Sequence, residues 1–188
     1  TDGMHINDIN ISTLSTADGI YGIGSATRKA VAINAHTSQT GVTASAYNTY
    51  TGVGGVDGIQ TGLTIKSGAA GNATTISDSG SMEELVDNIN RDAAGVTATL
   101  SSDGKITLSN DTGAAIVVAF AGATQAAHTG LTDGTYEGFL SLSDDNNEEI
   151  KLTTALATDG EINSYGFNES TGSSTVSGGA VSGSALAR

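Results

Sequence analysis

The sequence contains no cysteine, no proline and no tryptophan, and aromatic residues make up only 4% of its 188 positions. Without cysteine the chain has no disulfide, no thiolate nucleophile and no cysteine-ligated zinc site. It also lacks any apolar run of about 18 residues, so it predicts no membrane-spanning helix. Because hydrophobic residues make up only 37% of the chain, the core is expected to be small and aliphatic.

Basic residues are also scarce. The 7 lysines and arginines stand against 20 aspartates and glutamates, which gives a formal net charge of -13. A field of this sign repels the phosphate backbone of nucleic acids and the head groups of anionic lipids. We therefore expect neither a nucleic-acid partner nor a membrane partner.

Glycine, by contrast, is abundant, with 26 residues, and Asp-Gly pairs recur along the chain. Because this dipeptide supplies the positive φ angles of tight hairpin turns, the sequence predicts a folded, β-rich chain. The pairs are Asp2-Gly3, Asp18-Gly19, Asp57-Gly58, Asp103-Gly104, Asp133-Gly134 and Asp159-Gly160. Residues 170–184 are the exception, since they are almost all Ser, Gly, Thr, Ala and Val, which predicts a linker.

The clearest helix signal lies in the second half of the chain. Ser81 and Glu84 have the spacing of a capping box, in which the hydroxyl and the carboxylate each bind an unpaired N–H of the helix start. An apolar stripe with helical periodicity follows, and Gly95 is expected to end the helix. The stripe consists of Met82, Leu85, Val86, Ile89 and Ala93.

Alternating apolar residues predict the strands of this half. Two hairpins are expected, over 96–108 and 139–154, with turns at 102–105 and 144–147. The other strands predicted here are those at 63–65, around 76 and at 116–120.

The first half is predicted to begin with one strand over 4–11, broken by a single irregularity. A helix over 25–38, which Ser25 can cap, is expected to stop at Gly41. Residues 42–47 then alternate between apolar and polar side chains as a strand.

An internal repeat relates the two halves. The first predicted helix contains Ile33-Asn34 and is followed by Gly-Val-Thr-Ala at 41–44. The second contains Ile89-Asn90 and is followed by the same four residues at 95–98. Each unit reads as a helix closing on Ile-Asn, a glycine that permits a sharp exit, and a β-branched pair that starts the next strand.

These motifs resemble the IN motif in the variable outer domains of bacterial flagellins. The matching pieces are 6–11 for the opening strand, 32–34 and 88–90 for the helix ends, and 103–108 for the hairpin. Residues 136–151 are similar to the closing hairpin of flagellins of the Campylobacter and Helicobacter type. In pieces, the resemblance extends over 4–165.

The resemblance implies an α+β fold with two small β-rich domains, each a short antiparallel sheet with one packed helix. It also implies a structural, non-enzymatic role in an extracellular flagellar filament that serves motility, with other flagellin subunits as partners. Neither end shows the long heptad-patterned helices of the family's conserved segments, so we expect the surface-exposed outer region.

Two departures from the family pattern bear on the domain organisation. Asp8 stands where the family usually has glycine, and the first unit lacks its own hairpin directly after Tyr47. We interpret this as an insertion. Residues 1–56 and 135–188 form a proximal domain, of which 169–188 is a flexible linker, and 57–134 form an inserted distal domain. A tandem arrangement is the alternative.

No group of residues has the pattern of an active site. His5, His36 and His128 are far apart in the sequence and lack the spacing of paired metal ligands. The acidic run at 144–149 offers oxygen ligands for calcium but not the spacing of an EF-hand, so a solvated turn is expected. We therefore predict no catalytic, cofactor or metal site.

Modification of surface hydroxyls is expected instead, because flagellin outer domains of this type often carry O-linked glycan. The candidates are Ser15, Thr16, Thr51, Ser170 and Ser173. Asn-x-Ser/Thr sequons also occur, at Asn10, Asn72, Asn110 and Asn168, at a number that chance explains in a chain this rich in hydroxyls.

Two other functions stay open. IN motifs also occur in hook-associated and filament-cap proteins, which lie at the filament ends. A surface adhesin or carbohydrate-binding module would need exposed aromatic platforms, for which the candidates are Tyr47, Tyr50, Tyr136 and Phe139.

Overall fold

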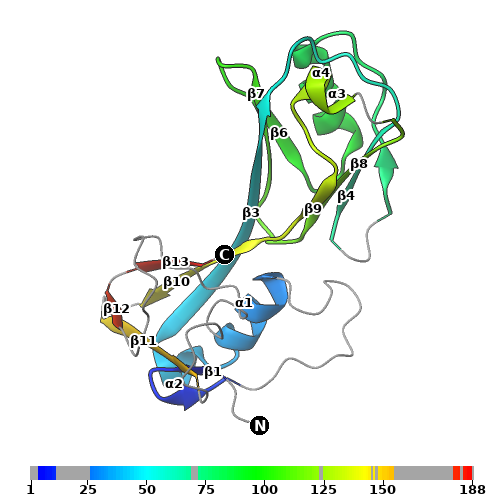
Figure 1. Cartoon of the computed structure of the whole chain (residues 1–188). Coiled ribbons are helices and arrows are strands. Elements are labelled where there is room, and N and C mark those ends of the chain that lie inside the picture. The colour runs from blue at the N-terminus through cyan, green and yellow to red at the C-terminus, as the bar shows by residue number, and fades with distance from the viewer. Residues whose placement is uncertain are drawn as a thin grey trace.

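The computed structural model describes residues 4–11, 26–68, 72–122, 125–144, 146, 148–154, 180–182 and 184–187. Strands predominate, and every strand pairing in this part of the chain is antiparallel, which confirms the α+β class (Figure 1). The helices are α1 (Ala26–Asn34), α2 (Thr37–Thr40), α3 (Met82–Asp92) and α4 (Gln125–Thr129).

The strands form three sheets, with the orders β12-β11-β1-β2, β13-β10-β3-β7-β6 and β5-β4-β8-β9. Their bounds are β1 (Met4–Ile6), β2 (Ile9–Asn10), β3 (Val42–Gly54), β4 (Leu63–Ser67), β5 (Thr74–Thr75), β6 (Thr97–Leu100), β7 (Lys105–Asn110), β8 (Ile116–Phe120), β9 (Gly134–Tyr136), β10 (Phe139–Asp144), β11 (Glu149–Thr154), β12 (Ala180–Ser182) and β13 (Ser184–Ala187).

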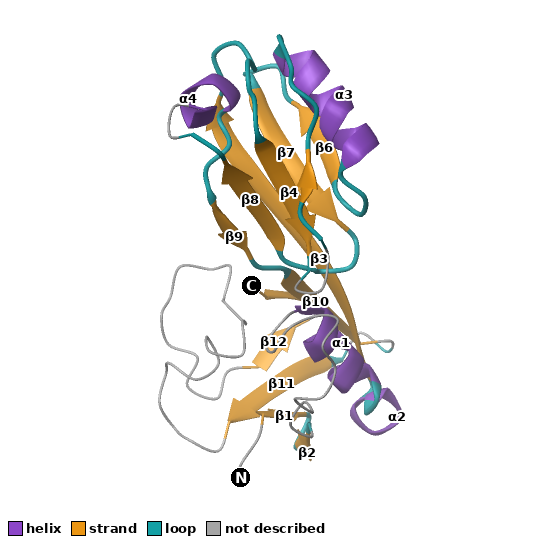
Figure 2. Ribbon diagram, turned by 90° about the vertical axis from the view of Figure 1, so that its right-hand side faces the viewer, coloured by secondary structure: helices purple, strands orange, loops and turns teal. Residues whose placement is uncertain are grey.

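Strand β3 is the longest, with 13 residues, and it belongs to both ends of the molecule. Its first part, 42–47, pairs with β10, and its second part, 48–54, pairs with β7 on the opposite side. Figures 1 and 2 show it running from the group that holds α1, α2, β1 and β11 to the group that holds α3, α4, β4 and β8.

Two separate hydrophobic cores lie at the two ends of β3. One is built around α1 from Ile6, Ile11, Ala26, Ala30, Ile33, Val42, Ala44, Leu140, Leu142, Ile150 and Leu152. The other is built around α3 from Leu63, Ile65, Ile76, Met82, Leu85, Ile89, Ala93, Val96, Ala98, Ile106, Leu108, Ile116, Val118 and Leu131. Both cores are aliphatic, as the composition predicts.

The elements predicted around α3 are confirmed. The helix buries four of the five predicted stripe residues and half-buries Val86. Strands β4, β6, β7 and β8 lie where the alternation placed them, and β6 pairs with β7 as a hairpin. In the capping box, Ser81 Oγ accepts from the Glu84 N–H at 3.1 Å, but the Glu84 carboxylate accepts from the N–H of Gly80 at 2.8 Å instead of that of Ser81.

The single strand predicted over 4–11 is wrong. Residues 4–10 form a small hairpin, β1 and β2, with Asn7 and Asp8 in the turn at φ of 50° and 65°. Asn and Asp tolerate this left-handed conformation better than other non-glycine residues. Asp8 therefore holds a turn position in the left-handed conformation.

The hairpin predicted over 139–154 has the right strands but the wrong pairing. β10 pairs with β3 and β13, whereas β11 pairs with β1 and β12 in another sheet. Leu140 and Leu142 from β10 and Ile150 and Leu152 from β11 all enter the core around α1. Alternation marks the buried face of each strand, but it does not identify the neighbouring strand.

The helix predicted over 25–38 is divided. α1 ends at Asn34, and the short α2 follows and ends at Thr40. Gly41 comes next with a φ of 72°, so the predicted stop is confirmed. Ser25 lies outside the described residues. In the predicted linker, β12 and β13 lie within 180–187, whereas 169–179 lie outside the described residues.

Candidate functional site

The Ile-Asn pair at the end of α3 joins the helix to strand β6. Ile89 is fully buried in the core, while Asn90 is exposed and turns its amide toward the strand. Asn90 Nδ2 donates to the Ala98 carbonyl at 3.0 Å, and the Ala98 N–H donates to Asn90 Oδ1 at 2.8 Å. The side chain thus satisfies both backbone polar groups of one strand residue.

The Ile-Asn pair at the end of α1 does the same. Ile33 is buried and Asn34 exposed. Asn34 Nδ2 donates to the Ala44 carbonyl at 2.8 Å, and the Ala44 N–H donates to Asn34 Oδ1 at 2.7 Å. Because Ala44 and Ala98 hold the same place in Gly-Val-Thr-Ala, the two units contain one shared device, which we call the asparagine clamp (Asn34 on Ala44, Asn90 on Ala98).

In the first unit, side chains of α2 extend the clamp along β3. Thr37 Oγ1 donates to the Val42 carbonyl at 2.9 Å, and the Val42 N–H donates to Thr40 Oγ1 at 3.1 Å. Val42 and Ala44 are alternate residues of β3. Their backbone N–H and C=O groups point away from β10, to the side that β7 occupies further along the strand. Helical side chains therefore stand where a paired strand would otherwise lie.

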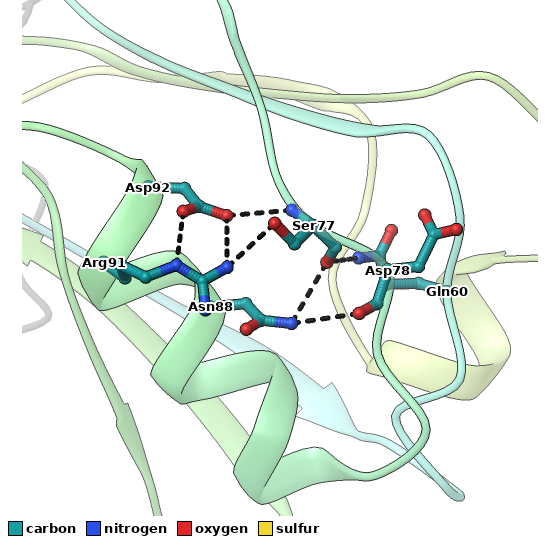
Figure 3. A network of polar contacts seen from close by, with 6 residues as sticks. All are labelled: Gln60, Ser77, Asp78, Asn88, Arg91 and Asp92. Atoms are coloured by element: carbon teal, nitrogen blue, oxygen red, sulfur yellow. Dashed lines mark hydrogen bonds and ion pairs between the residues drawn. The ribbon is translucent and has the colours of Figure 1, made fainter.

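A second polar network fixes the segment before α3 (Figure 3). Asn88, which is 5% exposed, donates from Nδ2 to the carbonyls of Ser77 and Asp78 at 3.2 and 3.0 Å. Gln60, which is 1% exposed, donates from Nε2 to the same Ser77 carbonyl at 2.8 Å. Since both amides are buried and paired, this network holds the chain against the helix.

At the exposed side of this network, Arg91 and Asp92 bind Ser77. Arg91 Nη2 donates to Ser77 Oγ at 2.8 Å, and Asp92 Oδ2 accepts from the Ser77 N–H at 2.9 Å. The Arg91 side chain, and after it the N–H of Ser77, hold the pKa of Asp92 well below its ordinary value.

The four aromatic residues proposed as a sugar platform form two pairs near the middle of the molecule. Tyr47 stacks on Phe139 with ring centroids 5.5 Å apart, and Tyr50 stacks on Tyr136 at 3.5 Å. Burial and the hydrogen bond with Tyr50 raise the pKa of Tyr136. Each ring covers one face of its partner, which leaves fewer ring faces on which a sugar could stack.

Asn48 lies in the middle of β3, where the strand passes from one core to the other; we call this place the crossing. Its side chain is buried, with 1% exposed. Its Nδ2 donates to the carbonyls of Ala114 and Tyr136 at 2.8 and 2.7 Å, and its Oδ1 has no partner within the described part of the chain. The amide therefore ties β3 to Ala114, just before β8, and to Tyr136 at the end of β9. The sequence contains no local signal for this role.

Each of the three histidines contacts a different neighbour. His36 Nδ1 lies 3.0 Å from the Ala32 carbonyl, His128 Nδ1 lies 2.8 Å from Asp57 Oδ1, and His5 Nε2 lies 3.3 Å from the Asn10 amide. Within the described ranges, no three His, Asp or Glu residues are grouped so that they could hold a metal ion.

The acidic run at 144–149 begins as a closed turn. Asp144 Oδ1 accepts from the N–H groups of Asn146 and Glu148 at 2.8 and 3.0 Å. This carboxylate therefore organises the backbone between β10 and β11.

Of the candidate glycosylation sites, the structure describes Thr51 alone. It is exposed, and its hydroxyl lies 2.9 Å from that of Thr107 on the neighbouring strand. The other candidates, Ser15, Thr16, Ser170 and Ser173, lie outside the described residues.

Sequence reasoning found the repeat but missed what its asparagines do. The signal was present, since a polar residue recurs in both units between an apolar isoleucine and Gly-Val-Thr-Ala, where packing of the core does not require it.

The described helices include none with the length and apolar character needed to cross a membrane.

Residues 62–112 match the family model described as "Flagellin hook IN motif". The match covers β4, β5, α3, β6 and β7, and so includes the second asparagine clamp. A search of curated proteins gives no match. The family match supports a flagellin-related protein, and that family is structural, extracellular and assembled from flagellin subunits.

Proposed function

We propose that this chain is the surface-exposed outer region of a flagellin, which projects from the bacterial flagellar filament and serves motility without catalysing a reaction. The observation that carries the proposal is the asparagine clamp. It occurs within the matched range and again, with the same two hydrogen bonds, in the first unit outside that range. Two linked units of one kind suit a spacer that projects from a polymer.

We further propose a nested domain order, with 57–134 inserted between 1–56 and 135–188. The core around α1 draws its residues from 6–44 and from 140–152, whereas the core around α3 draws its residues from 63–131. The inserted part also depends on β3, because β7 pairs with residues 48–54. The proximal part would include 169–188, in which β12 and β13 pair with β11 and β10 and so are not the flexible linker that the sequence predicted.

The surface supports a role in contact with solvent. A net charge of -13 on 188 residues keeps neighbouring copies apart by mutual repulsion. Exposed hydroxyls such as that of Thr51 offer attachment points for O-linked glycan. We propose the five candidate hydroxyls as sites, to be tested by mass spectrometry of protein from the source cells.

A hook-associated or filament-cap protein is the second candidate, because the description of the matching family names the hook as well as flagellin. It would have the same two units at the filament ends instead of along the filament. The stacked aromatic pairs give no support to an adhesin.

Immunogold electron microscopy of the source cells, with antibody raised against these 188 residues, tests the proposal. Label along the whole filament is the expected result. Label confined to the hook junction or the tip would favour the second candidate. Gold on the cell body beside bare filaments would refute both.

A further inference from the structure

Tyr50 on β3 and Tyr136 on β9 form the closer of the two stacked ring pairs in the described part of the chain. Their ring centroids are 3.5 Å apart, and the ring planes are inclined by 16°. Both side chains are partly exposed, so a small molecule in solution can reach them. The two rings are therefore close enough to react with each other and accessible enough to be oxidised.

Thr132 fixes how the two rings face each other. Its N–H donates to Tyr50 Oη at 3.0 Å, and its carbonyl accepts from Tyr136 Oη at 2.8 Å. Because both hydroxyls meet the same residue, they lie at the same end of the stack, and the Cε carbons beside them face one another. These carbons carry much of the unpaired electron density when a phenol loses an electron and a proton. Their p orbitals stand perpendicular to the ring, and so point at the facing ring.

We propose that Tyr50 and Tyr136 are a site of oxidative cross-linking, at which a one-electron oxidant joins the two rings as dityrosine. Each phenol gives up one electron and its hydroxyl proton to form a phenoxyl radical. The two radicals pair their electrons in a new bond between two Cε atoms. Each bonded carbon then loses its hydrogen as a proton while the neighbouring oxygen takes up a proton from water, which restores both rings and both hydroxyls. In total the pair loses two electrons and two protons, and the oxidant takes the electrons.

The cross-link lies at the base of the part of the chain that is built around α3. All the buried residues of that core lie within 63–131, and so between the two tyrosines in the sequence. A bond between Tyr50 and Tyr136 closes this whole stretch into a loop, which lowers the conformational entropy of the unfolded chain. Because the sequence has no cysteine, no disulfide can do the same. This inference holds whether or not the chain belongs to a filament.

The second stacked pair cannot react in this way. Tyr47 faces Phe139, with ring centroids 5.5 Å apart, and phenylalanine has no hydroxyl from which a phenoxyl radical could form. Tyr47 is therefore a matched control, since it is a stacked and partly exposed tyrosine of the same strand with no tyrosine opposite.

The test oxidises the full chain, at low concentration, with persulfate and a light-activated ruthenium complex. This reagent removes one electron at a time from tyrosine, and each persulfate that accepts two electrons ends as two sulfate ions. Intact mass and peptide mapping locate the link. The variants are Tyr50→Phe and Tyr136→Phe, with Tyr47→Phe as the control. A pair-only variant, which combines Tyr21→Phe, Tyr47→Phe and Tyr165→Phe, keeps no tyrosine except the proposed pair.

We expect the wild-type monomer to become lighter by two hydrogen atoms, with the link between Tyr50 and Tyr136. The Tyr47→Phe control and the pair-only variant should form the same link, whereas Tyr50→Phe and Tyr136→Phe should not. In urea the yield of the link should fall by more than about tenfold, because the folded chain holds the two rings together. Links that form only between molecules, or a folded pair-only variant that is oxidised without forming the link, would overturn the proposal. An equal yield in urea would also overturn it.

Discussion

Replacing Asn48 with alanine should weaken the crossing between the two cores. The change removes two hydrogen bonds, a buried one to the Ala114 carbonyl and a partly buried one to the Tyr136 carbonyl. At the usual value of about 0.5–1.5 kcal/mol per bond, the loss is about 1–3 kcal/mol. The Ala114 carbonyl keeps a second donor, the Asn110 amide at 2.8 Å, and removal of the unpaired Oδ1 of Asn48 offsets part of the loss. We therefore expect a loss of about 2 kcal/mol in the free energy of unfolding.

Two further variants make the prediction specific. Asn110→Ala removes a bond to the Ala114 carbonyl, which keeps the Asn48 amide, and an exposed bond from the Thr112 hydroxyl, so it should cost less than Asn48→Ala, about 1 kcal/mol. Asn48→Asp places a carboxylate against two carbonyl oxygens in a buried site, which should cost about 3–5 kcal/mol at neutral pH. Urea unfolding followed by circular dichroism gives the three values. If Asn48→Ala costs no more than Asn110→Ala, or if Asn48→Asp is as stable as Asn48→Ala, the crossing is not held by this amide.

Three other changes test the remaining parts of the fold. Leu85→Ala empties a fully buried position in the core around α3 and should cost about 2–5 kcal/mol in urea unfolding, whereas a cost near zero would mean that the core is not packed there. Gly130→Ala should cost about 2–4 kcal/mol, because the residue has a φ of +73° and a Cβ would overlap the carbonyl oxygen of Val53; unchanged stability would contradict this close approach. The pKa of Asp92 is depressed in the folded state, so its contribution is present above the unfolded pKa and is lost as pH falls through the folded pKa. Asp92→Asn should therefore flatten the acid side of the stability curve, and a curve that keeps the wild-type slope would show that the ion pair with Arg91 does not form.

The sequence predicted the local elements better than their partners. The stripe on α3 and the alternation in β6 and β7 are local patterns, and the structure has both. The strand alternation in 139–154 is equally clear, but β10 and β11 pair with β3 and β1 instead of with each other. Both partners are distant in the sequence, so the local pattern does not identify them. The break at Asn7 and Asp8 was also too short to distinguish a turn from an irregularity within one strand.

The candidate site was predicted as a repeat but not as a mechanism. Ile-Asn and Gly-Val-Thr-Ala stand at different separations in the two units, so no fixed spacing in the sequence predicts that Asn34 binds Ala44 or that Asn90 binds Ala98. Gln60 and Asn88 converge on Ser77 from opposite sides, which no local pattern predicts.

The most direct test of the proposed function is an electron cryomicroscopy reconstruction of filaments from the source cells. We expect every subunit to carry an outward projection into which the two cores and the long strand β3 fit without rearrangement. Filaments built from subunits that lack this projection, in cells that make the chain, would contradict the account.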